Sequence, residues 1–362
     1  MGKRRAIIHI GTEKTGTTSI QEVLARIRGE LLERGFAYSV SAGHKNHLRL
    51  AAYAGEPQRV KALRNEVANR PDAGGPHERF PDDLAAELAQ LPESVHTVIF
   101  SGEHCHSRLV TTDCVSRLKQ LLDRHFSEFV ILVYLRRQDE LAVSSYSSQL
   151  RNGSRRAQIL PESAGGSAYY DYAALLDRWS SVFGRAAMQP RLFGRSHFFE
   201  GDLIRDFLHV CAVGPIIIPN FMPPLNTSLL PHAQELLRRF NAMKPDHPAQ
   251  PQPRWAFTLL KERFSGPGRK PTRDAAIAFV RQFEAGNERV RAEYFPNRDR
   301  LFSDDFGAYP ASEEPVSDSA VLDVAMAVIA HLSTGPGGPV RGPGTRPKAE
   351  AAILHERLLE SA

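Results

Sequence analysis

The most informative segment of the chain is Ile7-Ile8-His9-Ile10-Gly11-Thr12-Glu13-Lys14-Thr15-Gly16-Thr17-Thr18. Residues 5–10 form a short apolar run that predicts a buried strand, and residues 11–16 form a loop with a glycine at each end. Apolar residues then recur at helical spacing: Ile20, Val23, Leu24, Ile27 and Leu31. A strand that enters a helix through such a loop predicts an anion site, because backbone N–H groups gather at the start of the helix.

The same alternation of strand and helix continues along the chain. Apolar runs predict strands at 36–40, 96–101 and 129–135, with a short one near 191–193. Helical periodicity predicts helices at 112–124, 138–151, 170–183, 228–241, 255–264 and 273–293. Near-continuous apolar strands between helices predict an α/β fold with a mainly parallel sheet flanked by helices, followed by a largely helical second half.

The composition excludes several classes of protein. The chain has 362 residues, of which 42% are hydrophobic and 24% charged, which is typical of a soluble globular protein and not of a disordered one. No apolar run approaches the ~18 residues of a membrane span, so we expect no integral membrane segment. The basic start of the chain lacks the apolar stretch of a secretory signal, which predicts a cytoplasmic location.

The net charge and the cysteines indicate which kinds of ligand and cross-link the chain is expected to have. The net charge of +5 suits an anionic ligand but is too small to indicate nucleic acid. The three cysteines form no CxxC pair, which argues against both a disulfide framework and a zinc ribbon. The run His104-Cys105-His106 has no evident fourth ligand, so we expect no metal site.

The loop is similar to the Walker A phosphate loop but differs at one decisive position. Gly11 and Gly16 keep the G-x-x-x-x-G spacing, yet Thr17 stands where the motif has its lysine, and the lysine of this loop is Lys14. A nucleoside-triphosphate site places that lysine on the β- and γ-phosphates and uses a Ser or Thr for Mg²⁺. The fold is therefore predicted to be P-loop-like, with a different anion in the loop.

The full string from His9 to Gln21 resembles the 5′-phosphosulfate loop of the bacterial sulfotransferases that use 3′-phosphoadenosine 5′-phosphosulfate (PAPS), whose signature is Lys-Thr-Gly-Thr-Thr. The resemblance implies that PAPS is the co-substrate and that no metal takes part. It also assigns the loop residues to the cofactor: Lys14, Thr15, Gly16, Thr17 and Thr18. Lys14 then serves catalysis too, by placing a positive charge on the leaving phosphate.

That family pairs the loop with a second motif, an arginine at the end of a later strand with a serine eight residues on and an aromatic residue soon after. Arg136 and Ser144 have this spacing, and Tyr146 follows. Arg137 and Ser145 have it as well, so the register stays open by one residue; we prefer Arg136 and Ser144. An arginine in this place can bind phosphate through two parallel hydrogen bonds.

Transfer to a hydroxyl also needs a proton acceptor, and two segments after strands offer one. His44 and His47 follow the second predicted strand, where many Golgi-type relatives carry a glutamate base. Glu103 follows the third strand, where the same relatives have a Glu-Lys-Ser run. We favour His47 as the base, because an unperturbed histidine titrates near pH 6.5. Glu103 would then orient the acceptor, although the reverse assignment stays open.

These observations predict a sulfotransferase that moves the sulfuryl group of PAPS to a hydroxyl, that of a glycan or small metabolite. The alternatives are a nucleotide kinase or NTPase on the same scaffold and a non-catalytic nucleotide-binding protein. The predicted domains are a sulfotransferase domain at 1–312, a C-terminal helix at 313–333, a flexible Gly/Pro linker at 334–347 and a short terminal helix at 348–362.

Overall fold

The chain folds as two compact units. The computed structural model describes residues 4–162, 167–216, 228–243 and 254–333. The first unit comprises residues 1–141, 163–223 and 280–304, and the second comprises 142–162, 224–279 and 305–362. The predicted linker at 334–347 and terminal helix at 348–362 lie outside the described residues.

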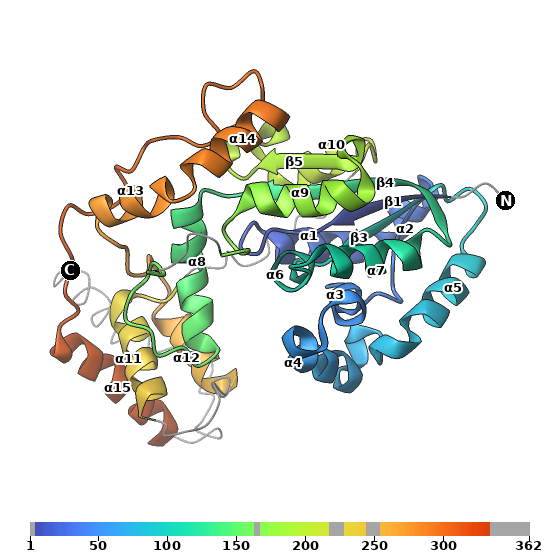
Figure 1. Cartoon of the computed structure of the whole chain (residues 1–362). Coiled ribbons are helices and arrows are strands. Elements are labelled where there is room, and N and C mark those ends of the chain that lie inside the picture. The colour runs from blue at the N-terminus through green and yellow to red at the C-terminus, as the bar shows by residue number, and fades with distance from the viewer. Residues whose placement is uncertain (1–3, 163–166, 217–227, 244–253, 334–362) are drawn as a thin grey trace. The chain divides into compact units, whose positions relative to one another are not determined.

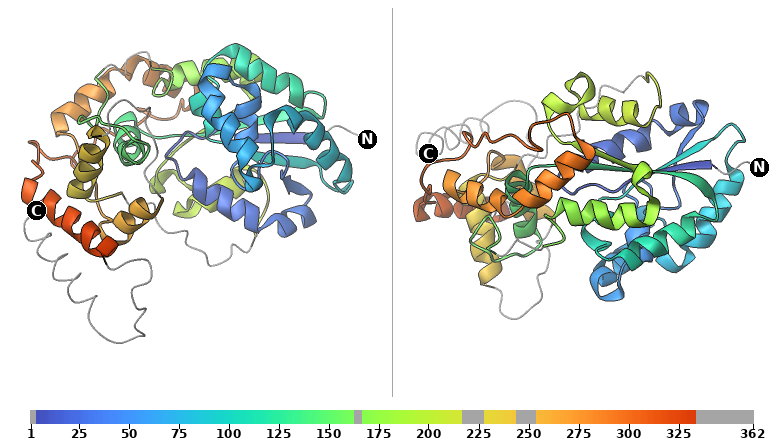
Figure 2. Two further views of the ribbon diagram at one scale, coloured as in Figure 1. Left: turned by 90° about the horizontal axis from the view of Figure 1, so that it is seen from below. Right: turned by 45° about the horizontal axis from the view of Figure 1, so that its top comes forward.

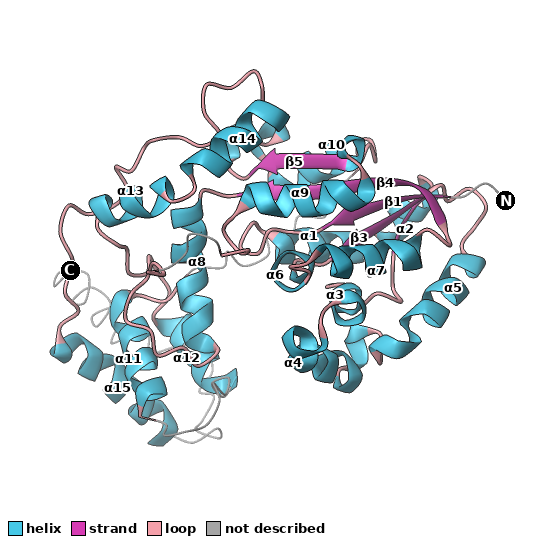
Figure 3. Cartoon of the chain, in the orientation of Figure 1, coloured by secondary structure: helices cyan, strands magenta, loops and turns pink. Residues whose placement is uncertain are grey.

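A five-stranded parallel sheet forms the centre of the first unit (Figure 3). Its order is β2-β3-β1-β4-β5, and the strands are β1 Arg4–His9, β2 Phe36–Tyr38, β3 Thr97–Ser101, β4 Phe126–Leu135 and β5 Met188–Leu192. Apolar side chains fill β1, β3 and β4 because parallel strands are covered on both faces. The predicted α/β fold with a parallel sheet flanked by helices is confirmed.

Helices cover both faces of this sheet (Figures 1 and 2). One face packs against α1 Thr17–Arg26, α2 Arg28–Glu33 and α10 Leu203–Val210, and the other carries α7 Thr112–Leu122 and α9 Tyr172–Phe183. The remaining helices of this unit are α3 Leu48–Ala54, α4 Pro57–Asn69, α5 Phe80–Gln90, α6 His104–Arg108 and α14 Glu284–Tyr294. Short 3-10 turns lie at Pro71–Ala73, His77–Arg79, Arg185–Ala187, Arg195–His197 and Phe199–Gly201.

The carboxyl ends of the strands meet at one edge of the sheet. His9 of β1 pairs in register with Ser101 of β3, and Leu135 of β4 pairs with Leu192 of β5. The residues that follow these strands are therefore neighbours, although they are far apart in the sequence. This edge is where open parallel sheets bind their ligands.

The second unit is helical among its described residues. It holds most of α8 Gln138–Arg151, with α11 Pro231–Ala242, α12 Arg254–Arg263, α13 Arg273–Arg281 and α15 Asp318–Ser333. Its apolar core is made by Tyr146, Leu150, Ile159, Leu229, Leu230, Ala233, Leu237, Leu260, Phe264 and Val324. The predicted helix at 138–151 and the helical second half are confirmed.

One predicted helix is wrong. The sequence predicts a single helix at 273–293, but the structure has α13 and α14 with a break at Phe283, where the backbone has φ −109° and ψ 4°. The Phe283 N–H donates to Val280 O (2.9 Å), which closes a tighter turn than an α-helix allows. The Phe283 ring instead packs against Tyr170 at 6.0 Å, so tertiary packing overrides the helical pattern.

None of the helices in the described part of the chain is long and apolar enough to cross a membrane. All three cysteines are buried free thiols. Over residues 4–333, leaving aside the gaps between described segments, no three His, Cys, Asp or Glu side chains gather in a way that would hold a metal ion.

Candidate functional site

The loop between β1 and α1 is anchored on the neighbouring strand β4. Thr12 donates to Tyr134 O from both its N–H and its hydroxyl, each at 3.0 Å, and Tyr134 N–H donates back to Gly11 O (2.7 Å). The Thr15 hydroxyl donates to Thr12 O (2.6 Å). Both threonine hydroxyls are therefore used to shape the loop, and Thr15 can offer a ligand only its backbone N–H as a hydrogen-bond donor.

Four consecutive backbone N–H groups at the start of α1 have no acceptor within the described residues. They belong to residues 15–18, whereas the N–H of Ser19 already donates to Gly16 O (3.0 Å). The first N–H groups of a helix have no partner inside the helix, and the helix dipole adds positive potential at this end. The loop thus has the donors and the potential to bind an anion.

Three residues of the loop have a positive φ, the first of them Gly11 at 107°. Lys14 has φ 64° and Gly16 has φ 73°, and such residues turn successive N–H groups into an anion-binding concavity. A side chain at Gly16 would be strained by this φ, and its Cβ would lie 2.3 Å from Leu203 Cδ2, so the leucine side chain would have to move. A lysine in this conformation costs about 1 kcal/mol, which is typical of functional loops.

Arg136 lies beside this loop, at the end of β4. Its Nη1 donates to Lys14 O (3.0 Å), its Nε donates to Glu140 (3.2 Å), and its guanidinium lies 5.3 Å from the centre of the Phe193 ring. The side chain is 23% exposed, so solvent reaches it. Arg136 therefore places a guanidinium next to the loop, and it stays a predicted cofactor ligand.

Arg137, the alternative in the other register, has a structural role. Its guanidinium binds the fully buried Asp139 through two hydrogen bonds of 2.7 and 2.9 Å, and its Nη1 donates to Ser303 O (2.8 Å). These contacts favour Arg136 as the residue that meets a ligand.

The remaining residues of the second motif lie in the second unit. Tyr146 belongs to that unit's apolar core, where it is 1% exposed and its hydroxyl donates to Arg156 O (3.2 Å). Ser144 lies two turns into α8, is half-buried, and stays a predicted cofactor ligand.

Glu103 lies where β3 ends, directly against the loop. A Cβ on Gly11 would come within 3.3 Å of Glu103 Cα, so the glycine allows the two segments to meet. Two side-chain amides hold the half-buried carboxylate: Gln21 Nε2 donates at 2.6 Å and Asn46 Nδ2 at 3.0 Å. The carboxylate is thereby oriented while keeping acceptor capacity for a further proton donor.

His47, the base favoured by the sequence, is instead packed inside the first unit. It is 0% exposed, stacks on Tyr38 at 4.3 Å and accepts a hydrogen bond from Ser101 N–H at Nδ1 (3.0 Å). Its Nε2 is buried and has no partner among the described residues. An acceptor cannot reach a ring in this position, so we revise the assignment and place His47 in the core. His44 of the same loop is exposed.

Glu13 brings a carboxylate into the loop, and its neighbours hold it. Tyr169 donates its hydroxyl to Glu13 (3.0 Å), and Glu13 N–H donates to His106 Nδ1 (3.4 Å). Burial acts to raise the pKa of this carboxyl, but the nearby His106 and the Tyr169 hydroxyl are among the contacts that outweigh it, so the pKa lies below its usual value.

Sequence reasoning missed Gln21, Asn46, Phe193 and Tyr169 as contacts of the site. Of these four residues, Phe193 could have been predicted, because it directly follows β5 and so lies at the edge of the sheet where the site is. Gln21 lies one helical turn after Thr17 on α1, but nothing in the sequence pairs it with Glu103.

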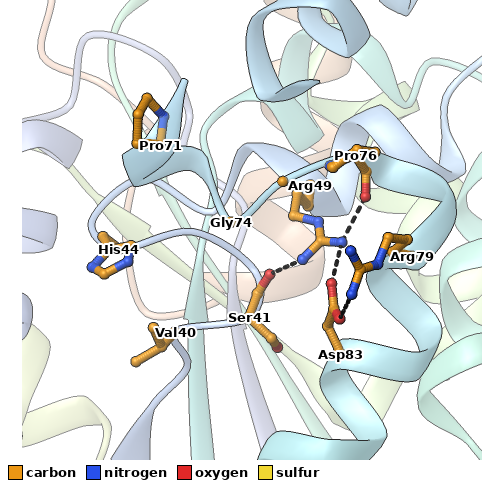
Figure 4. A pocket seen from close by; sticks show the side chains of 10 residues that line it. Val40, Ser41, His44, Arg49, Pro71, Gly74, Pro76, Arg79 and Asp83 are labelled. Atoms are coloured by element: carbon orange, nitrogen blue, oxygen red, sulfur yellow. Dashed lines mark hydrogen bonds and ion pairs between the residues drawn. The ribbon is translucent and has the colours of Figure 1, made fainter. Parts of the chain in front are cut away.

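A hollow of about 470 Å³ lies beside the segment that carries Asn46 (Figure 4). Arg49 is fully buried in its wall and donates to Ser41 O (2.7 Å), Pro76 O (2.6 Å) and Asp83 (2.7 Å). Glu87 of α5 accepts hydrogen bonds from the backbone N–H groups of residues 40 and 41. These contacts fix the position of residues 39–49. They therefore also fix Asn46, whose side-chain amide orients Glu103.

The buried histidines make the protein sensitive to acid. Burial lowers the pKa of His47 to about 3 and of His106 to about 4, from a usual 6.5. As the pH falls, these histidines take up protons in the unfolded state before they do so in the folded state. The free energy of unfolding is therefore highest above pH 6.5, and it decreases as the pH falls from 6.5 toward the pKa values of the folded protein. In this pH range, each of the two histidines should lower the free energy of unfolding by roughly 1.4 kcal/mol for every pH unit of acidification.

Urea unfolding at pH 7.5 and pH 5.5 measures this loss. His47→Gln should reduce the difference between the two pH values by about 1.4 kcal/mol, because the titrating ring is gone. His44→Gln replaces an exposed histidine of the same loop and should leave the difference as in the wild type. Equal losses for all three proteins would show that His47 does not remain neutral in the folded state.

The chain is similar in part to two known proteins. A scan against protein-family models finds none that matches the chain. An uncharacterized protein of Archaeoglobus fulgidus is 29% identical over 176 residues, 47% of each chain, so this chain spans about half the length of the curated relative. A crystal structure of a sulfotransferase from Alicyclobacillus acidocaldarius matches 67% of this chain and 92% of its own, with 19% identity and a TM-score of 0.39.

Proposed function

We propose that this protein is a sulfotransferase that moves the sulfuryl group of PAPS to the hydroxyl of an acceptor, a glycan or small metabolite. The observation that carries the proposal is the set of four backbone N–H groups at residues 15–18, next to Lys14 and Arg136. PAPS has two anionic ends, the 5′-phosphosulfate and the 3′-phosphate. The loop amides suit the first end and the Arg136 guanidinium suits the second.

In the proposed reaction, the acceptor oxygen attacks sulfur in line with the bond to the 5′-phosphate. A new O–S bond forms as the old one breaks, and adenosine 3′,5′-bisphosphate leaves with the electron pair. Negative charge grows on the leaving phosphate, where the loop N–H groups and the Lys14 ammonium are proposed to stabilise it. Positioning and charge stabilisation by these groups carry the transfer.

Glu103 is the proposed proton acceptor. Its carboxylate lies at the same sheet edge as the loop, is half-buried, and is oriented by Gln21 and Asn46. A base must come within hydrogen-bond distance of the hydroxyl it deprotonates, and the fully buried His47 does not meet that requirement. Thr17 and Thr18 contribute backbone donors to the co-substrate, and Ser144 is proposed to add a hydroxyl from α8.

Glu103→Gln tests the base. The amide keeps the shape of the side chain but cannot take a proton, so the single-turnover rate with a surrogate hydroxyl acceptor should fall roughly 10²–10⁴-fold. Affinity for adenosine 3′,5′-bisphosphate should be unchanged. His47→Gln, measured at pH 7.5 where the variant is folded, should keep most of the rate. If His47→Gln lost the rate and Glu103→Gln kept it, the original assignment of the histidine would be restored.

Ligand-induced stabilisation distinguishes the proposed function from its rivals. Adenosine 3′,5′-bisphosphate at ~100 times its dissociation constant should add roughly 2.7 kcal/mol to the unfolding free energy, a measurable thermal shift. ATP with Mg²⁺ should add much less, because the loop lacks the lysine after Gly16. Stronger stabilisation by ATP that depends on Mg²⁺ would indicate a nucleotide kinase or NTPase. Binding of the bisphosphate with no turnover of any hydroxyl acceptor would indicate a non-catalytic nucleotide-binding protein.

A further inference from the structure

The loop between β1 and α1 contains a carboxylate of its own. Glu13 lies directly before Lys14 and two residues before Thr15, which carries the first of the four free N–H donors. Consecutive Cα atoms are about 3.8 Å apart, so the Cα of Glu13 lies at most about 7.6 Å from that of Thr15. A negative charge this close repels an anion in the loop, and the repulsion grows with the charge of the anion. A glutamate inside an anion-binding loop therefore needs an explanation.

Three hydrogen bonds hold Glu13 in place and form a closed set. The Tyr169 hydroxyl donates to Glu13 Oε2 (3.0 Å), Glu13 N–H donates to His106 Nδ1 (3.4 Å), and His106 Nε2 lies 2.9 Å from Tyr169 O. A backbone N–H can only donate and a carbonyl oxygen can only accept, so Nδ1 is the acceptor and Nε2 carries the proton. His106 is therefore neutral in this arrangement and does not pair with the carboxylate as a cation.

The negative charge of Glu13 is not cancelled by an ion pair with another described residue. In the part of the chain that the structure describes, the carboxylate is bound by the Tyr169 hydroxyl and by no lysine or arginine. Burial acts to raise the pKa of this carboxyl, but its polar neighbours outweigh burial and hold the pKa below its usual value. The carboxyl is thus ionised at neutral pH, and the loop combines its N–H donors with one fixed negative charge.

A fixed negative charge can distinguish anions that have the same shape. The phosphosulfate of PAPS carries one negative charge on its phosphate and one on its sulfate. A diphosphate has nearly the same shape, but its terminal phosphate ionises a second time near pH 6 and carries about −1.5 to −2 at pH 7. Hydrogen-bond donors in the loop can bind both groups. A repulsive charge disfavours the more highly charged group, and binding sites commonly obtain specificity in this way.

We propose that Glu13 is a specificity-determining residue that makes the loop prefer a 5′-phosphosulfate over a 5′-diphosphate or a longer polyphosphate. This inference rests on the proposed function, because it takes PAPS as the co-substrate. The loop N–H groups attract either anion, and the Glu13 carboxylate sets the difference between them. Tyr169 and His106 are positioning residues, since they fix where this charge lies relative to the donors.

Calorimetric titration of the full chain with two ligands tests the inference. The ligands are PAPS and adenosine 3′-phosphate 5′-diphosphate, both without Mg²⁺ and without an acceptor. Glu13→Gln keeps the shape of the side chain and an oxygen for the Tyr169 hydroxyl but removes the charge. The ratio of the diphosphate Kd to the PAPS Kd should fall roughly 3–10-fold, as expected for one charge acting over about 8 Å near a protein surface.

Two further variants separate charge from loop geometry. Glu30→Gln removes the same charge from an exposed position on α2 and should leave the ratio as in the wild type. Tyr169→Phe removes the hydrogen bond but keeps the carboxylate, so it should change the ratio less than Glu13→Gln does. An unchanged ratio in Glu13→Gln overturns the inference. An equal fall in Tyr169→Phe also overturns it, because the shape of the loop would then set the preference.

Failure of the proposed function gives a different result. In that case neither nucleotide binds the wild-type protein, and inorganic pyrophosphate and sulfate replace them as the pair of ligands. A fall in the ratio of the pyrophosphate Kd to the sulfate Kd in Glu13→Gln, but not in Glu30→Gln, would still support selection by charge at this loop. An unchanged ratio for these two ions would overturn it.

Discussion

Lys14→Ala should lower turnover roughly 10²–10³-fold, the loss expected when one preorganised charge is removed from a developing anion. Lys14 lies in the loop that offers four backbone donors, and its backbone is held by Arg136 through a hydrogen bond of 3.0 Å. Its ammonium is needed most when the bond to the leaving phosphate breaks, so kcat should fall by more than cofactor affinity does. Single-turnover kinetics with PAPS and a surrogate acceptor, beside calorimetric binding of adenosine 3′,5′-bisphosphate, separate the two effects.

The matched control is Lys61→Ala, which removes an exposed lysine on α4. It changes the net charge by the same amount and should leave both quantities as in the wild type. A loss of affinity as large as the loss of rate would show that Lys14 binds ground state and transition state alike. Unchanged turnover in Lys14→Ala would contradict the proposed site.

Arg136→Ala should weaken binding of adenosine 3′,5′-bisphosphate by about 2–5 kcal/mol, the cost of truncating one partner of a charged hydrogen-bonded pair. The guanidinium is part-buried between the loop and the Phe193 ring, so water replaces it poorly. Fold stability should change little, because Glu140, the acidic residue that pairs with Arg136, is itself 42% exposed. Calorimetric titration and urea unfolding measure the two quantities.

Arg137→Ala is the informative counterpart. It removes the guanidinium that pairs with the buried carboxylate of Asp139, which should destabilise the fold by about 3–5 kcal/mol. The variant protein that remains folded should bind the bisphosphate as the wild type does. If Arg137→Ala weakened binding and Arg136→Ala did not, the register of the second motif would shift by one residue. If neither did, the motif would have no part in binding.

The order of strands and helices along the chain can be predicted from the local pattern of apolar residues. Apolar periodicity predicts the strands and most helices because each element must turn one side toward a core, and that requirement acts over a few neighbouring residues. The loop from Gly11 to Gly16 and the arginine after β4 are visible for the same reason. In a parallel sheet, the ends of successive strands also share one edge, so the sequence can place Lys14, Glu103 and Arg136 in one neighbourhood.

Residues of the same type or role within that neighbourhood are distinguished by their three-dimensional contacts and not by the sequence. His47 and Glu103 both follow strands, but Tyr38 and Ser101 bury the histidine while Gln21 and Asn46 hold the carboxylate at the loop. Arg136 and Arg137 are adjacent in sequence, yet one meets the loop and the other meets Asp139. The burial and the hydrogen-bond partners of a polar side chain depend on segments that are distant along the chain. The periodicity of apolar residues is a local pattern and does not predict those contacts.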